Sequence, residues 1–481
     1  MAGCGVRFVV DGEVVAVDGP PTTTLLQWLR GSGRTGTKEG CAEGDCGACA
    51  VAVLDRPSGR WRVVNACLVL LPMVDGTEVV TVQGLATGGE AHPVQAAMVD
   101  AMGSQCGYCT PGFVMTLFEA CYRADLDGPG RAWKLDDQLS GNLCRCTGYR
   151  PIRDALGQVA GLRPDDRFRG REAGALPELA VSHGEQRFDA PVTLAEAVAR
   201  LAAAPDTRIV CGATDLGLDV TQRHVAFPAL LSVERVPELR GIAVRPDGAA
   251  VIGAATPLVD LEDWSADGLP VLHRMLRYFG SRPIKHRATL GGNLCNASPI
   301  GDLAPVLLAL DAVCVAVGAE GEREIPLGSF FTGYRQTALR PGELLARVVV
   351  PPLPERARVG AYKVSRRREL DISAVAAGMR VDVDAGGVVR GARLGYGGVA
   401  ATPVRARATE DALVGRPWTE GSVAEVLPVL DGELSPIDDH RGSAWFRRTL
   451  ARNLLVGFQA ETAERAFLPL PDRHAGTVVV G

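Results

Sequence analysis

Residues 40–50 read GCAEGDCGACA, and their cysteine spacing indicates the fold of the N-terminal part of the chain. It places Cys41, Cys46 and Cys49 at Cys-x4-Cys-x2-Cys spacing, and Cys67 follows after 17 further residues. A loop that brings several thiolates to one metal cluster must turn its backbone amides toward the sulfurs, which small residues allow. The glycines and alanines of the stretch supply that freedom.

The spacing of this first cysteine set is that of a plant-type [2Fe–2S] ferredoxin. A zinc site is the alternative, but zinc sites usually pair two Cys-x2-Cys knuckles, and the first set has only one. We therefore predict a [2Fe–2S] cluster in a ferredoxin-like domain of the β-grasp type over residues 1–87. The predicted helix is Thr24–Leu29, and the predicted strands are Arg7–Val10, Glu13–Val17, Ala50–Leu54, Trp61–Val64 and Val79–Val82.

A second cysteine set consists of Cys106-x2-Cys109 and Cys144-x-Cys146, separated by 34 residues. Spacing alone leaves a structural zinc site or a redox pair open. Each pair precedes a predicted helix, whose N-terminal N–H groups favour an anionic cluster. Residues 88–163 are predicted to form a small four-helix domain. Its helices are expected at Pro93–Met102, Pro111–Arg123, Asp136–Leu143 and Pro151–Val159.

Two motifs around the second set carry a family resemblance. QCGYCTPG (Gln105–Gly112) and GNLCRCTGYRPI (Gly141–Ile152) resemble the second cluster motifs of the xanthine dehydrogenase, or molybdenum hydroxylase, family. The order and spacing of both cysteine sets match this family over residues 1–160. The resemblance implies a second [2Fe–2S] cluster held by Cys106, Cys109, Cys144 and Cys146.

Two glycine-rich segments follow, RIVCGATDLG (208–217) and RATLGGNLCNASPIGDLAP (287–305). Neither a Walker A motif nor a clean GxGxxG in strand–helix context accompanies them. They resemble the loops that hold the flavin in the FAD domain of the same family. The resemblance implies flavin contacts from Ile209, Val210, Cys211, Gly212, Ala213, Thr214, Asp215 and Leu216, from Thr289, Gly291, Gly292, Asn293 and Asp302, and from Phe279, Leu345 and Lys363. By themselves, Phe279 and Leu345 are typical of core packing, and Lys363 of a solvated surface.

Length and composition limit the remaining possibilities. The chain has 481 residues, a net charge of −5 and 13 cysteines, so a basic nucleic-acid binder is not expected. The lack of a signal peptide and of a long apolar run predicts a cytoplasmic protein without a membrane anchor. The fold class expected is α+β multidomain, with a linker over 164–188, an FAD-binding α+β domain of the vanillyl-alcohol-oxidase-like type over 189–354 and a smaller α+β flavoprotein domain over 355–481. The five other cysteines are expected to be small buried hydrophobic residues: Cys4, Cys121, Cys211, Cys295 and Cys314.

The resemblance, which extends over about residues 5–465, also implies a function. The chain is similar to the small subunit of bacterial xanthine dehydrogenases, which leaves the molybdenum cofactor to a molybdopterin-binding large subunit in an (αβ)2 or higher heteromer. Electrons would pass from that partner to the helical-domain cluster, then to the ferredoxin-like cluster, to FAD and to NAD+ as co-substrate. The basic run Ser365–Leu370 is a candidate docking surface for NAD. Two alternatives remain, another molybdenum hydroxylase (for nicotinate, quinoline, aldehyde or CO) and a stand-alone NADH-linked flavoprotein.

Overall fold

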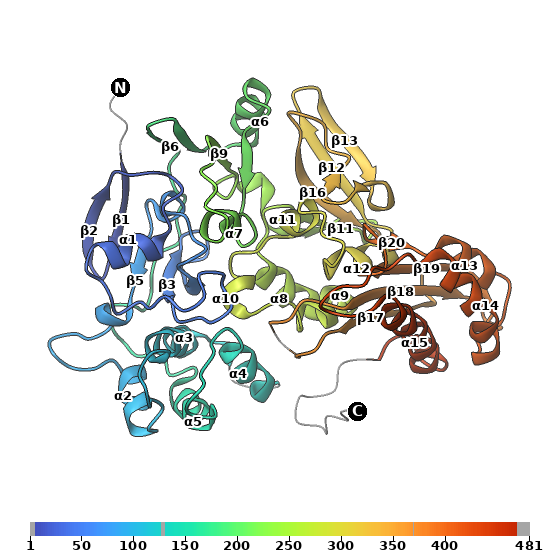
Figure 1. Ribbon diagram of the computed structural model, residues 1–481, viewed down its shortest axis with the longest axis horizontal. Helices are drawn as coiled ribbons and strands as arrows, with labels where there is room; N and C mark the ends of the chain where they lie inside the picture. Colours follow the sequence, from blue (N-terminus) through green and yellow to red (C-terminus); the bar gives the residue numbers. More distant parts are fainter. Residues whose placement is uncertain (1–4, 127–129, 369, 469–481) are drawn as a thin grey trace.

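The N-terminal unit is a five-stranded sheet in the order β2-β1-β5-β3-β4. The structure, a computed structural model, describes residues 5–126, 130–368 and 370–468. β1 and β5 run parallel and the other neighbours antiparallel, and helix α1 lies against the sheet (Figure 1). The elements are β1 (Val6–Val10), β2 (Glu13–Val17), α1 (Leu25–Gly31), β3 (Ala50–Asp55), β4 (Arg60–Asn65), a short 3-10 helix η1 (Leu71–Val74) and β5 (Glu78–Val80). Thr24 and Gln27 form a capping box that starts α1 one residue after the predicted position.

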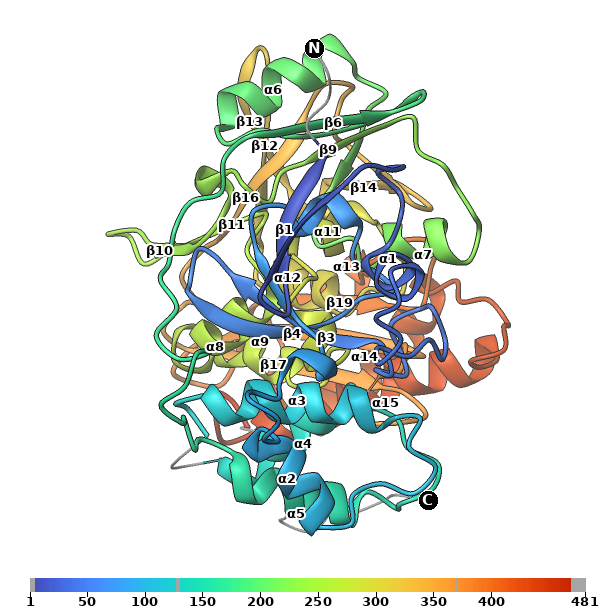
Figure 2. The ribbon, with the colours of Figure 1, turned by 90° about the vertical axis from the view of Figure 1, so that its left-hand side faces the viewer.

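Four helices form the second unit, which lies beneath the first sheet in both ribbon views (Figures 1 and 2). They are α2 (Pro93–Asp100), α3 (Thr110–Tyr122), α4 (Arg131–Leu139) and α5 (Arg150–Val159). The third helix differs from its prediction, Asp136–Leu143, because it begins earlier and ends at Leu139. Residues beyond Leu139 must leave the helix, since a Cβ at Gly141 would lie 2.6 Å from Pro283 and the N–H of Leu143 bonds outside the helix.

The next part of the chain contains two sheets with helices between them. The sheets have the orders β6-β7-β9-β8 and β10-β11-β16-β12-β13. Their strands are β6 (Leu179–His183), β7 (Gln186–Ala190), β8 (Arg208–Val210), β9 (Ala229–Ser232), β10 (Ile242–Val244), β11 (Ala250–Gly253), β12 (Val313–Gly318), β13 (Gly321–Pro326) and β16 (Leu344–Val350), with the small hairpin β14 (Phe331–Gly333) and β15 (Gln336–Thr337). Their helices are α6 (Leu194–Ala203), α7 (Leu216–Thr221), α8 (Leu258–Gly268), α9 (Pro270–Leu276), α10 (Arg282–Lys285), α11 (Leu290–Cys295) and α12 (Leu303–Ala309). The linker predicted over 164–188 is wrong in its last part, because β6 and the start of β7 pair there as a sheet hairpin.

The last unit is an antiparallel sheet in the order β17-β18-β19-β20, with three helices after its last strand. Its elements are β17 (Ala357–Val364), β18 (Val375–Val383), β19 (Val389–Gly397), β20 (Val404–Arg405), α13 (Arg407–Leu413), α14 (Glu420–Glu433) and α15 (Ala444–Thr462). Helix α12 packs on β18 and β19 so closely that a Cβ at Gly378 would lie 2.3 Å from Val306. The predicted α+β multidomain class is confirmed. Cys4 lies outside the described residues.

Helix α10 joins three units through buried charges. Lys285, 1% exposed, pairs with Asp137 of α4 at 3.1 Å and with Glu262 of α8 at 2.6 Å. Arg282 donates to Glu119 of α3 at 2.8 Å. Next to the helix, His286 bonds through Nδ1 to the backbone oxygen of Val63 in β4 at 2.7 Å, which ties in the first sheet. None of the helices in the described parts of the chain combines the length and the apolar composition that a membrane-spanning helix requires.

Candidate functional site

The first cysteine loop follows α1 and leads into β3. Gly44 and Gly47 adopt φ values of +86° and +66°, which fold the loop back on itself. The backbone N–H groups of Glu43 and Cys46 both donate to the sulfur of Cys41 at 3.4 Å. A Cβ at Gly40 would lie 2.8 Å from the sulfur of Cys46, so glycine permits the close approach. Amides directed at sulfur fit an anionic cluster.

The four thiols of this set lie close enough to one another to shift each other's pKa. The Cys46 thiol is hydrogen-bonded to Cys41 and lowers the pKa of Cys41 to about 5, while the pKa of Cys46 is raised. The Cys49 thiol is hydrogen-bonded to Cys67, and this contact together with burial raises the pKa of Cys67. A deprotonated sulfur is the form that binds iron.

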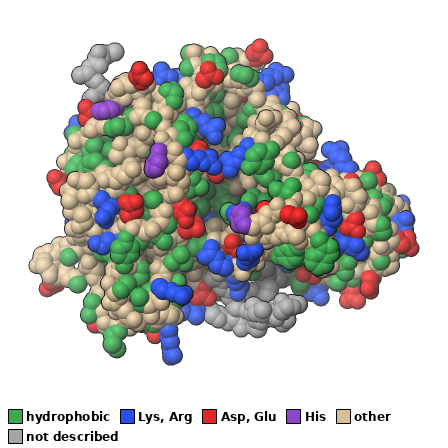
Figure 3. Space-filling view, in the orientation of Figure 1, with side chains coloured by type: hydrophobic (Ala, Val, Ile, Leu, Met, Phe, Trp, Pro, Cys, Tyr) green, Lys and Arg blue, Asp and Glu red, His purple; other side chains and the backbone are tan. Residues whose placement is uncertain are grey.

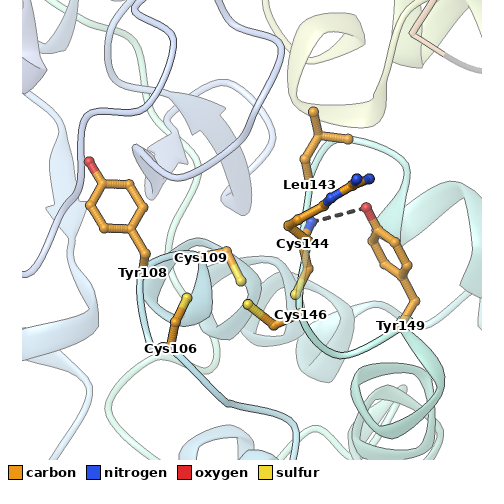
Figure 4. A pocket seen from close by; sticks show the side chains of 8 residues that line it. Cys106, Tyr108, Cys109, Leu143, Cys144, Cys146 and Tyr149 are labelled. Carbon is orange, nitrogen blue, oxygen red and sulfur yellow. Dashed lines mark hydrogen bonds between the residues drawn. The ribbon is translucent and has the colours of Figure 1, made fainter.

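The second set gathers four thiols at the surface of the helical unit, and Figure 4 shows them pointing toward one another. Cys106 and Cys146 are exposed, whereas Cys109 and Cys144 are partly buried. Burial and the neighbouring Cys144 thiol raise the pKa of Cys109 to about 12. Burial opposes ionisation of Cys144, but the hydroxyl and N–H of Thr147 donate to its sulfur at 3.2 and 3.4 Å and lower its pKa.

A shallow cavity of about 450 Å³ opens above these thiols. Its wall contains Tyr108, Leu143 and Tyr149 besides the cysteines. The hydroxyl oxygen of Tyr149 accepts the N–H of Cys144 at 3.0 Å, as the dashed line in Figure 4 marks. The second cysteine set is therefore reached directly from the surface.

The second set offers the same kind of donors as the first, because Cys109 lies close to Cys144 and Cys106 lies close to Cys146. Thiols with N–H and hydroxyl groups directed at their sulfurs fit an anionic [2Fe–2S] cluster.

The two cysteine loops touch each other. The N–H of Leu143 donates to the carbonyl oxygen of Cys46 at 3.0 Å, and the Nδ2 of Asn142 donates to the carbonyl oxygen of Gly47 at 3.1 Å. Thr116 of α3 holds the amide oxygen of Asn142 at 2.7 Å. A Cβ at Gly112 would lie 2.1 Å from the oxygen of Gly47. Side chains at these glycines would push the two loops apart.

A larger cavity of about 870 Å³ is lined mostly by the central part of the chain, together with residues of the first cysteine loop and of the last unit. The face in Figure 3 is hollowed near its centre, with charged side chains around the hollow. Both glycine-rich segments wall the cavity, together with Phe279, Leu345 and Lys363. The residues named from the resemblance that line it are Ile209, Val210, Cys211, Ala213, Thr214, Asp215, Leu216, Phe279, Thr289, Gly291, Gly292, Asn293, Asp302, Leu345 and Lys363. Of that set, Gly212 is the member that does not line the cavity.

Polar groups inside this cavity suit a large polar ligand. The Oδ1 of Asn293 is buried without a hydrogen-bond partner, so a ligand can satisfy it. Thr289 starts α11 by accepting the N–H of Gly292 at 3.1 Å. The cavity has the size of a cofactor site, and its donors and backbone turns fit FAD.

Lys363 is not the solvated residue that its sequence alone predicts. Its side chain is 4% exposed, and its Nζ donates to Asp302 at 2.7 Å and to the carbonyl oxygen of Tyr278 at 3.0 Å. Ser373 donates to the other carboxylate oxygen of Asp302 at 2.5 Å. The lysine therefore orients Asp302 and the residue before Phe279.

Several cavity residues were missed from the sequence. Glu43 and Asp45 of the first cysteine loop line the cavity, and burial raises the pKa of Asp45. Gln222, just after α7, donates to the carbonyl oxygen of Ala42 at 3.1 Å and holds this loop against the central unit. Cys295, expected to be a packing residue, also lies on the wall. The sequence signal that could have identified Glu43, Asp45 and Cys295 is their closeness to the cysteine ligands and to Thr289.

Family models match nearly the whole chain in succession. A 2Fe-2S iron-sulfur cluster binding domain matches residues 8–71, and a [2Fe-2S] binding domain matches 81–157. An FAD binding domain in molybdopterin dehydrogenase matches 185–353, and a CO dehydrogenase flavoprotein C-terminal domain matches 360–462. These matches fit an iron–sulfur and FAD subunit of the molybdenum hydroxylase family. The chain contains two [2Fe–2S] domains and an FAD-binding domain.

Known members of the molybdenum hydroxylase family are similar along most of this chain. Xanthine dehydrogenase of Emericella nidulans is 32% identical over 524 residues, which include 94% of this chain and 38% of that protein. Xanthine dehydrogenase of Oryza sativa subsp. japonica is 31% identical, covering 95% of this chain and 39% of that protein. The chain thus spans well under half the length of these relatives.

Solved structures of the family share the fold over part of the chain. Reconstituted CO dehydrogenase from Oligotropha carboxidovorans matches with a TM-score of 0.54 and 27% identity, over 60% of this chain and 99% of that chain. Quinoline 2-oxidoreductase from Pseudomonas putida 86 matches with a TM-score of 0.53 and 27% identity, over 57% of this chain and 95% of that chain.

Proposed function

We propose that this chain is the electron-transfer subunit of a molybdenum-dependent xanthine dehydrogenase with NAD+ as acceptor. The observation that carries the proposal is a continuous line of contacts. Cys106 and Cys146 open on the surface, the Leu143–Cys46 hydrogen bond joins the two cysteine loops, and Glu43 of the first loop lines the flavin cavity. When bound, the clusters supply one-electron transfer and FAD supplies hydride transfer.

A molybdopterin-binding large subunit is the proposed partner, and the surface around the second cysteine set supports its docking there. The side chains that line the cavity include Tyr108 (51% exposed), Leu143 (40%) and Tyr149 (38%). Apolar side chains clustered on a surface mark protein contacts. We propose an (αβ)2 or higher heteromer in the cytoplasm, where clustered thiols stay reduced.

The basic segment that ends at Leu370 supports NAD as the acceptor. Leu370 and Asp371 line the flavin cavity, as does Arg441 of a neighbouring loop. The N–H of Arg367 donates to Asp371 at 2.8 Å, which fixes this segment at the rim. The guanidinium of Arg441 on the cavity wall would attract the phosphates of a dinucleotide.

The experiment is purification of the native complex from its host, with identification of its subunits and assay of its substrates. We expect a molybdopterin-containing partner and xanthine-dependent reduction of NAD+. Oxidation of CO, quinoline, nicotinate or an aldehyde in place of xanthine would assign the chain to another hydroxylase of the family. Reduction of oxygen alone would contradict NAD+ as acceptor. A native chain that is monomeric and oxidises NADH would contradict the subunit assignment itself.

A further inference from the structure

The two loops that wall the flavin cavity touch each other behind it. Gly212 and Ala213 have φ values of +75° and +60°, so the first loop turns through two left-handed residues. A Cβ at Gly212 would lie 2.0 Å from the carbonyl oxygen of Arg287, at the start of the second loop. Glycine is therefore required at this point for contact between the loops.

Glu234, shortly after β9, binds both loops from the side away from the cavity. Its Oε1 accepts the N–H of Gly212 at 2.5 Å. The Nη2 of Arg287 donates to the two carboxylate oxygens at 2.6 and 2.8 Å. Val233 lines the cavity, whereas its neighbour Glu234 is not one of the described residues that line it. Glu234 thus fixes both loops without occupying ligand space.

The ion pair between Glu234 and Arg287 also affects the electrostatics of the cavity. A bare carboxylate behind loops that receive an anion would repel it, and Arg287 neutralises that charge. Arg287 stands two residues before Thr289, which caps α11 and holds the N–H of Gly292. It also lies 3.8 Å from the sulfur of Met73 in η1, so the pair touches the ferredoxin-like unit as well.

We propose that Glu234 is a positioning residue for the diphosphate of the bound dinucleotide. It holds the N–H of Gly212 in place and, through Arg287, sets the second loop, so that both backbones face the same anion. The inference rests on the proposed flavin contacts of these loops and names the side chain that sets their relative position.

The test measures binding of ADP by calorimetry to the full chain after removal of its flavin. Glu234→Gln keeps an oxygen acceptor but loses the ion pair, and we expect about tenfold weaker ADP binding. Arg287→Met leaves the carboxylate of Glu234 without its ion pair, so the loss of ADP affinity should be larger. The double variant Glu234→Gln with Arg287→Met should recover part of the lost ADP affinity, because the negative charge of Glu234 is no longer present to repel the ligand. Glu238→Gln is the matched control, since this exposed carboxylate contacts the N–H of Leu194 at 3.2 Å outside the cavity.

Iron content and thermal midpoint of each variant complete the test. We expect both to match the unsubstituted chain in Glu234→Gln while ADP binding weakens. Unchanged ADP affinity in that variant would overturn the positioning role. A parallel loss of iron, stability and ADP binding would also overturn it, because Glu234 would then support folding in general. If the unsubstituted chain binds neither ADP nor FAD, the flavin contacts themselves are wrong, which separates that failure from the failure of Glu234 alone.

Discussion

The backbone N–H of Leu143 donates to the carbonyl oxygen of Cys46 across 3.0 Å. Leu143 directly precedes Cys144, so one hydrogen bond and a few covalent bonds join a predicted ligand of one cluster to a predicted ligand of the other. Asn142 adds its own hydrogen bond to Gly47 beside this link. A small change at this junction should therefore affect both cysteine sets.

Substitution of Gly47 by alanine tests the junction. The new Cβ would lie 2.2 Å from the carbonyl oxygen of Gly141, at a residue whose φ is +66°. Overpacking and the left-handed backbone together should lower the free energy of unfolding by about 3 kcal/mol. The midpoint of urea unfolding and the iron-to-protein ratio should both be lower than in the unsubstituted chain. Gly157→Ala in α5 is the control, because its Cβ meets nothing within 4 Å and should stabilise the helix by about 0.5–1 kcal/mol. Equal behaviour of the two variants would show that the loops do not touch at Gly47.

Replacement of Cys144 by serine should remove one cluster and spare the flavin. Iron should fall from about four to about two atoms per chain, since each [2Fe–2S] cluster holds two. Electron paramagnetic resonance of the reduced protein should lose one of two signals, while the flavin absorbance per chain stays constant. Cys314→Ala, at a buried cysteine of β12, should keep both signals. Retention of full iron in Cys144→Ser would remove Cys144 from the ligand set.

Local patterns predicted much of the fold. Strands were predicted over Arg7–Val10 and Glu13–Val17, and they pair as β1 and β2, while Asp11 and Gly12 between them adopt positive φ values of 52° and 87°. A helix was predicted over Thr24–Leu29, and it begins one residue later because Thr24 caps it. These features depend on neighbours within a few residues, so the sequence carries them directly.

Long-range contacts were beyond the sequence. The third helix was misplaced because Gly141 and Leu143 leave the helix to meet Pro283 and Cys46, which are remote in sequence. Glu234 lies 22 residues from Gly212 and 53 from Arg287, and no local pattern marks it as their common partner. Sequence motifs predicted the cavity residues that were named from the resemblance. The charged residues that support them, such as Glu234 and Arg287, come together only through packing between distant parts of the chain.

The ion pairs of Lys285 predict a large loss of stability on substitution. Burial disfavours the charged amine, but Asp137 and Glu262 outweigh it and raise the pKa of Lys285. Lys285→Met leaves two buried carboxylates without their partner, which should cost about 3–5 kcal/mol in the free energy of unfolding. Lys134→Met is the control, because Lys134 is 29% exposed and 3.7 Å from Asp125, so its loss should stay below about 1 kcal/mol. Similar urea midpoints for both variants would contradict a buried Lys285.

Glu262 predicts how stability depends on pH. Burial, with Asp137 and Asp263 nearby, raises its pKa from 4.5 to about 7, although Lys285 opposes the shift. Between those two values the folded chain holds a proton that the unfolded chain has released. The contribution of Glu262 to stability is therefore complete below pH 4.5 and is lost as pH rises to about 7.

Glu262→Gln separates this effect from other titrating groups of the same cluster. Arg282, Glu119 and His286 are present in both proteins, so their contributions cancel in the difference between the two unfolding free energies. The neutral amide does not titrate, and the variant should gain stability relative to the unsubstituted chain as pH rises from 4.5 to about 7, then keep a constant difference. Urea unfolding at a series of pH values measures the difference, and Glu238→Gln should give a curve parallel to that of the unsubstituted chain. If Glu262→Gln also gives a parallel curve, Glu262 does not take up its proton in this range.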